Sequence, residues 1–190
     1  MRLPRASSLL LLAALLTTPV STVRAQAGAD RLDSIARVIV AAAKYATFVT
    51  VDGAGRPRVR TIQPRPPEAG WSVWFATNPR TRKVPEIDRN PRVALHYFDP
   101  KTESYVAVTG RARVVRDRAT KDAHWDPAWN AFYPDRDNGV VLITIVADRI
   151  EVVSPRLGVD SDSATWRPQG FSPRAGRVRP PSPRREQLHD

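Results

Sequence analysis

The stretch WSVWFATNPRTRKVPEIDRNPRVALHY, residues 71–97, contains two candidate strands with a short helix between them. Its two ends are rich in β-branched and aromatic side chains, a composition typical of strands. Between them, Pro79 and Pro91 bound a helical segment over residues 82–90, because proline ends or kinks a helix near the residue before it. The stretch therefore predicts a strand, a proline turn, a short helix and a second strand.

Similar runs recur along the chain, separated by residues that favour turns. DGAG at residues 52–55 predicts a hairpin turn, and DPK at residues 99–101 predicts another turn. Short strands at this spacing favour a mainly β protein with short helices, built as an antiparallel sandwich or barrel. The expected strands cover residues 47–51, 58–62, 71–76, 93–97, 105–115 and 140–153.

An amphipathic helix is expected ahead of the first strand. Leu32, Ile35, Ala36 and Ile39 recur there at helical spacing. Acidic residues early in this segment favour the helix, because the N-terminal end of a helix dipole is positive. A further helical segment over residues 119–129 must be short, since it contains a proline near its end.

The first 27 residues have the pattern of a secretory signal peptide. Arg2 and Arg5 precede an apolar run over residues 9–16, and a small-residue Ala-Gln-Ala triplet follows at positions 25–27. The run is shorter than the roughly 20 residues that a permanent membrane span needs. We therefore expect cleavage near Ala27, export to the periplasm or the medium, and no stable membrane span.

The remaining chain is long enough for one domain with a hydrophobic core. Residues 156–190 are rich in Pro, Arg and Ser and poor in large apolar side chains, so we expect a disordered basic tail there and a folded domain over residues 28–155. The whole chain carries 30 Lys and Arg against 19 Asp and Glu, a net charge of +11. Such an excess tolerates anionic ligands such as phosphates, but we predict no nucleic-acid partner from it.

Several kinds of self-contained catalytic site are not expected. The chain has no cysteine, and its three histidines, His96, His124 and His189, lie well apart in sequence, so no metal site is predicted. Neither a G-x-S-x-G motif nor a glycine-rich nucleotide-binding motif occurs. We assign no catalytic residue, and expect any catalysis to come from a bound organic cofactor.

Hydroxyl and basic side chains gather where the short helix is expected to begin. Helix starts offer free backbone N–H groups and a partial positive charge, which suit a phosphate. Thr81 can add a hydroxyl donor, while Arg82 and Lys83 can add charge-assisted hydrogen bonds. This part of the chain therefore predicts a phosphate-binding site.

A second basic pair lies one strand earlier. Strand alternation places Arg58 and Arg60 on one face. Two arginines directed into a barrel would be costly unless an anion met them. If they point outward instead, they are ordinary surface charges.

Together these segments resemble the pyridoxamine 5′-phosphate oxidase-like superfamily, in particular its general-stress-protein branch of FMN-binding split barrels. The likeness covers residues 35–153, and TNPRTRK at residues 77–83 is similar to the family motif of Thr-Asn, two variable residues, Ser or Thr, then Arg-Lys. In that family the basic pair binds the flavin phosphate. The resemblance implies an antiparallel split β-barrel with an N-terminal helix, and FMN held by Arg60, Thr61, Ile62, Thr77, Thr81, Arg82, Lys83 and Tyr105.

The resemblance also assigns roles within this set. Arg60 falls where the family supplies an arginine to the phosphate side, with Thr61 and Ile62 offering backbone groups to the flavin ring. Tyr105 falls where a second subunit often contributes a polar side chain, which implies a homodimer. The aromatic segment over residues 125–134 is similar to one in the general-stress branch, and either belongs to the core or walls a ligand pocket.

One departure bears on the reaction. The vitamin-forming oxidases carry Arg-Leu-His after the last strand, whereas this chain has Arg156-Leu157-Gly158, so oxidation of pyridoxamine phosphate is not expected. Three functions remain open: an FMN-dependent oxidoreductase with a small-molecule substrate, a non-catalytic flavin-binding carrier or sensor related to stress, and a protein that binds anionic polymers through its basic tail. A deazaflavin or haem in place of FMN also remains open.

Overall fold

The computed structural model describes residues 20–173, which form one antiparallel sheet and three α-helices. The sheet has the strand order β2-β1-β4-β5-β6-β3, with β7 beside β6. The strands are β1 Ala46–Val51, β2 Pro57–Ile62, β3 Ser72–Thr77, β4 Arg92–Asp99, β5 Ser104–Val115, β6 Val141–Val153 and β7 Gln169–Phe171. The helices are α1 Val20–Ala43, α2 Lys83–Arg89 and α3 Arg118–Ala123, with 3₁₀ turns η1 Ala69–Trp71, η2 Pro127–Ala131 and η3 Pro155–Leu157.

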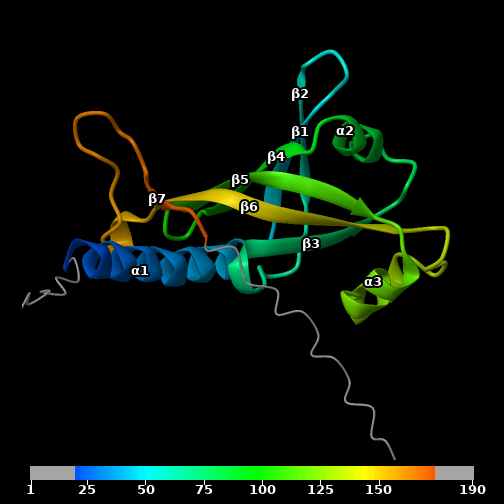
Figure 1. Cartoon of the computed structure of the whole chain (residues 1–190), viewed down its shortest axis with the longest axis horizontal. Coiled ribbons are helices and arrows are strands. Elements are labelled where there is room, and N and C mark those ends of the chain that lie inside the picture. Colours follow the sequence, from blue (N-terminus) through cyan, green and yellow to red (C-terminus); the bar gives the residue numbers. More distant parts are fainter. Residues whose placement is uncertain (1–19, 174–190) are drawn as a thin grey trace, which may run out of the picture.

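The sheet curls into a half-barrel, which confirms the predicted mainly β, antiparallel fold with an N-terminal helix. In Figure 1, β1 and β2 rise steeply from the molecule, while β3 and β6 run lengthwise above α1. The six long strands lie within two residues of their expected bounds. The proline-bounded helix is α2, and the interrupted helical segment is divided into α3 and η2.

The core lies between the concave face of the sheet and α1. Burial alternates along β1 and β4, as expected for strands with one face covered. Phe48 of β1 and Phe75 of β3 meet edge to face across the barrel, with ring centroids 5.3 Å apart. The predicted apolar face of the helix is confirmed, because Leu32, Ala36 and Ile39 are all buried in this core.

The helix begins earlier than the sequence pattern indicates. It starts at Val20, so the expected cleavage point near Ala27 lies within it, and cleavage stays a prediction. Within residues 20–173, no helix combines the length and apolarity that a membrane crossing requires.

The prediction of a disordered tail is wrong for residues 156–173. The strand β3 pairs with only the first half of β6, and β7 takes the free edge beside the second half, with Phe171 opposite Ile150. Val159 and Phe171 are both buried in the core, and Phe171 lies edge-on to Trp71. Two apolar side chains are enough to order the segment, because they join a core that already exists. The rest of the predicted tail, residues 174–190, lies outside the described residues.

We expect Phe171→Ala to lower the free energy of unfolding by about 3 kcal/mol, the usual cost of truncating a buried aromatic ring. Trp166→Ala is the matched control, since Trp166 lies in the same segment but is 81% exposed. Urea denaturation of the two variants measures the difference. If both unfold at the same urea concentration as the parent protein, β7 does not belong to the cooperative core.

Candidate functional site

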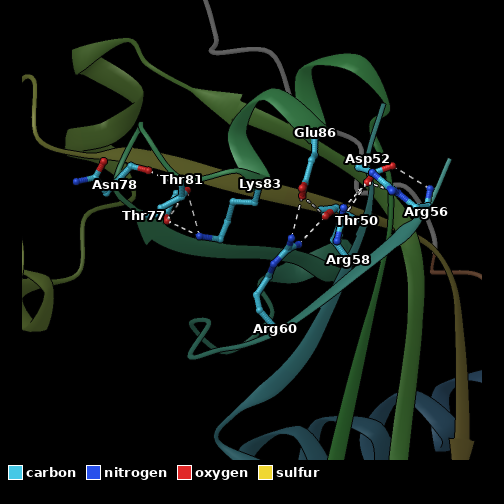
Figure 2. Close-up of polar contacts among 10 residues, drawn as sticks. All are labelled: Thr50, Asp52, Arg56, Arg58, Arg60, Thr77, Asn78, Thr81, Lys83 and Glu86. Carbon is cyan, nitrogen blue, oxygen red and sulfur yellow. Dashed lines mark hydrogen bonds and ion pairs between the residues drawn. The ribbon is translucent and has the colours of Figure 1, made fainter. Parts of the chain in front are cut away.

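A half-buried lysine ends the turn between β3 and α2. The Nζ of Lys83 donates hydrogen bonds to Oγ1 of Thr77, at 2.9 Å, and to Oγ1 of Thr81, at 3.2 Å. The hydroxyl of Thr81 donates in turn to the carbonyl oxygen of Asn78, at 3.0 Å, which fixes the turn. Figure 2 shows Lys83 reaching from the start of α2 toward Thr77 at the end of β3.

The charge of Lys83 has no counter-ion at hydrogen-bond distance. Its two partners are neutral hydroxyls, and no described carboxylate lies within ion-pair distance of it. Burial lowers the pKa of Lys83, and the positive charge of Arg60 lowers it further, although Glu86 acts in the opposite direction. A cation held in this way has the surroundings of an anion-binding group.

Arg60 lies on the inner face of β2, opposite Phe48 of β1. Its Nη2 donates to Oε2 of Glu86, at 2.8 Å, and its Nη1 donates to the hydroxyl of Thr50, at 2.5 Å. That hydroxyl donates its own proton to the same Glu86 oxygen. One buried carboxylate from α2 is therefore joined to two neighbouring strands (Figure 2).

Glu86 stays ionised in this setting. Burial alone would raise its pKa, but hydrogen bonds from Thr50 and Arg60, together with the charges of Arg60 and Arg82, outweigh burial and lower the pKa. Its side chain is 7% exposed, whereas that of Arg60 is 20% exposed. The carboxylate is thus enclosed, while the guanidinium still reaches the surface.

Each of the two arginines of β2 forms an ion pair with a carboxylate. Arg60 pairs with Glu86, and Nη2 of Arg58 lies 2.7 Å from Oδ2 of Asp52. Asp52 also accepts hydrogen bonds from the backbone of Ala54 and Arg56, which confirms that DGAG forms the β1–β2 hairpin turn. Both arginines lie on the inward side of the strand, and Arg58 is neutralised locally.

Three cations and one carboxylate make up what we call the cationic cluster: Arg60, Arg82, Lys83 and Glu86, together with the hydroxyls of Thr77 and Thr81. Arg82 is exposed and its guanidinium forms no hydrogen bond or ion pair among the described residues, yet its charge acts on Glu86. The cluster therefore carries two positive charges in excess. A phosphate monoester has nearly two negative charges at neutral pH, so the charges match.

The structure divides the predicted site residues between the two faces of the sheet. Thr77, Thr81, Arg82 and Lys83 gather with Arg60 in the cationic cluster, and Ile62 shares the inner side of β2 with Arg60.

Thr61 and Tyr105 lie on the outer face instead. Thr61 is in register with Thr47, which is in register with His96 of β4, and the ring of Tyr105 lies 5.3 Å from that of His96. Within one chain, Tyr105 is thus separated from the cationic cluster by the sheet.

Thr50 and Glu86 were missed by sequence reasoning. Thr50 occupies an inward position of β1, and Glu86 lies inside a short helix bounded by prolines, so alternation and helical spacing place each residue correctly. Neither signal shows that the two side chains meet. Within residues 20–173, no group of three or more His, Asp or Glu side chains is arranged to hold a metal ion.

Comparison with known proteins places this geometry in a family. Residues 31–154 match the family described as pyridoxamine 5′-phosphate oxidase like. The pyridoxine/pyridoxamine 5′-phosphate oxidase of Anaeromyxobacter dehalogenans is 33% identical over 96 residues, which are 49% of this chain and 48% of that protein. The oxidase of the same name from Neisseria meningitidis is 30% identical over 91 residues, 48% of this chain and 43% of that protein. The match thus spans about half the length of these relatives.

Solved structures share the fold. A protein related to general stress protein 26 from Clostridium acetobutylicum aligns with a TM-score of 0.60 at 18% identity, covering 75% of this chain and 93% of its own. General stress protein 26 of Bacillus anthracis aligns at 0.55 and 19% identity, covering 75% and 96%. An FMN-binding protein related to pyridoxamine 5′-phosphate oxidase from Nostoc punctiforme aligns at 0.50 and 17% identity, covering 77% and 94%. From its fold and the match over residues 31–154, the chain belongs to the pyridoxamine 5′-phosphate oxidase-like family.

Proposed function

We propose that the cationic cluster binds the phosphate of FMN, and that the protein is an FMN-dependent oxidoreductase acting on a small molecule. The observation that carries this proposal is the half-buried ammonium of Lys83, whose hydrogen-bond partners are hydroxyls alone. A phosphate would supply the missing negative charge. The FMN-binding relative from Nostoc punctiforme supports the choice of ligand, since it has the same fold.

The cluster has hydrogen-bond donors that are not used within the protein and can bind such a ligand. A guanidinium has five N–H donors, and Arg60 directs a hydrogen bond to each of Thr50 and Glu86. Its remaining donors, the ammonium of Lys83 and the exposed guanidinium of Arg82 can bind phosphate oxygens through charge-assisted hydrogen bonds. Glu86 would orient Arg60 without cancelling the excess positive charge.

Bound FMN would supply hydride or electron transfer, and the chain would hold and orient it. Its own residues would anchor the phosphate at the end of β3 and keep the flavin against β2, where Ile62 follows Arg60 on the inner side. A positive field from three cations would favour a negatively charged ligand throughout.

The proposal extends to a homodimer. Thr61 and Tyr105 lie on the outer face of the sheet together with Val59, 64% exposed, and Phe98, 49% exposed. A second copy placed against this face would cover the two apolar side chains. Export through the expected signal peptide is part of the same proposal and is supported by the sequence of residues 1–27 alone.

A second candidate is a flavin-binding carrier or sensor without turnover. One observation favours it: the carboxylate of the cluster, Glu86, is enclosed and its pKa is lowered, so it is a poor proton acceptor at neutral pH. Stopped-flow mixing of the flavin-loaded protein with NADPH or NADH separates the candidates. Rapid flavin reduction followed by reoxidation with a defined acceptor excludes the carrier, and no reduction by either donor favours it.

We expect the double variant Arg82→Ala, Lys83→Met to weaken FMN binding at least about 100-fold, because two charge-assisted hydrogen bonds are lost. Riboflavin, which lacks the phosphate, should bind both proteins equally. Arg80→Ala is the matched control: it removes one positive charge from an exposed position in the same turn. Calorimetric titration measures the affinities, and unchanged FMN affinity in the folded double variant would contradict the proposal.

The lowered pKa of Lys83 predicts two opposite pH effects. Between this pKa and the ordinary value of 10.5, the unfolded chain binds more protons than the folded one, so the free energy of unfolding without ligand should rise with pH. A phosphate favours the protonated amine, so FMN affinity should fall over the same interval. Titration and urea unfolding from neutral to alkaline pH measure both effects. Lys83→Met should remove both, and an identical pH profile in this variant would contradict the assignment.

A further inference from the structure

A cavity of about 560 Å³ lies where the chain following β2 meets the edge of β3. The backbone N–H of Arg65 donates to the carbonyl oxygen of Trp74, at 2.8 Å, and joins the two edges of the half-barrel. We call this space the seam cavity. Its walls come from the end of α1, the segment after β2, β3, β4, and the segment that contains η2. Its volume is typical of sites for small organic molecules.

The seam cavity has an aromatic wall, formed by Trp129, Phe132 and Tyr133. The hydroxyl of Tyr133 donates to the carbonyl oxygen of Ala76, and Trp129 lies edge-on to Trp125, so two of the three rings are held in place. Phe132 is 76% exposed beside the other two rings, so its ring is accessible to a ligand. Ring faces of this kind favour a flat, aromatic ligand.

A buried hydroxyl on the β4 side of the seam cavity lacks a partner among the described residues. Tyr97 lines the seam cavity, and its oxygen is buried without a hydrogen bond to any described residue. Burial raises the pKa of Tyr97, so the group remains a hydrogen-bond donor. An unpaired buried hydroxyl is unfavourable, and a ligand acceptor within reach would satisfy it.

The charges around the seam cavity favour a ligand with one negative charge. Arg65 is paired with Asp126, at 3.8 Å, and also donates to the carbonyl oxygen of His124. Lys44 lies on the rim, exposed, and no described carboxylate forms an ion pair with it. One positive charge therefore remains, whereas the cationic cluster has two.

We propose that the seam cavity binds a planar aromatic molecule with a single anionic group, such as an aromatic carboxylate. Ala76 lines the cavity, and the next residue of β3, Thr77, belongs to the cationic cluster, so the two sites lie on opposite faces of the end of the same strand. If FMN occupies the cluster, such a molecule is the substrate class of the enzyme. This last step rests on the proposed function, whereas binding to the cavity does not.

The probe is 2-naphthoate, titrated into the full-length protein without FMN and followed by calorimetry and tryptophan fluorescence. We expect one site per chain and at least about tenfold weaker binding of the neutral isostere 2-naphthamide, because the charge-assisted hydrogen bond is lost. Lys44→Gln should abolish the preference for the anion. Lys101→Gln, which removes an exposed lysine on the β4–β5 turn, is the control and should leave the preference unchanged.

Two further variants test the location. Ala128 is exposed on η2 and lines the seam cavity, so Ala128→Trp should block both naphthalene ligands without unfolding the protein. Tyr97→Phe removes the hydroxyl alone and should weaken both ligands. Naphthoate binding that is absent, or that persists unchanged in Ala128→Trp, would overturn the inference.

Titrations with FMN separate this inference from the proposed function. Naphthoate binding by a parent protein that binds no FMN supports the seam cavity while the proposed function fails. Naphthoate binding that survives Lys83→Met, while FMN binding is lost, supports both. Simultaneous binding of FMN and naphthoate supports both. Stoichiometric displacement of naphthoate by FMN would show that the cavity holds the flavin itself, and would overturn the assignment of a second ligand.

Discussion

The ion pair between Arg60 and Glu86 determines where the cationic cluster lies. It connects β2 to α2 through the hydroxyl of Thr50 on β1, and the guanidinium lies over the ring of Phe48, 5.7 Å from its centroid. A buried pair of this kind adds little net stability, because desolvation offsets the attraction. Its consequence is positional: a flexible arginine is held at the inner face of the half-barrel, near Lys83.

Two neighbouring sites with different charge follow from this arrangement. The cationic cluster keeps two unbalanced positive charges beside threonine hydroxyls, whereas the seam cavity keeps one beside aromatic rings. Coulomb interactions and hydrogen bonds would dominate binding at the first site, and apolar contact would dominate at the second. A phosphate-bearing cofactor and an aromatic monoanion therefore suit different sites, which lie on opposite faces of the end of β3.

Local sequence signals predicted most of the fold. Strand alternation and the two prolines around α2 located the long strands and the short helix, because these signals act between residues close in the chain. Composition misled at the C-terminal end. Residues 156–173 are poor in apolar side chains on average, yet Val159 and Phe171 reach the core, and β7 completes the edge that β3 leaves free. The average composition of a segment does not reveal that two of its apolar side chains reach the core.

By itself, the sequence determined the family, the order of strands and helices, and the basic motif over residues 77–83, since all of these are patterns along the chain. Only the tertiary structure decided that Glu86 meets Arg60, 26 residues away, and that Thr61 and Tyr105 lie on the opposite face of the sheet from the cluster. It also assembled the seam cavity from separate segments. The physical reason is that side-chain contacts and enclosed space depend on chain crossings between distant residues, which no local pattern encodes.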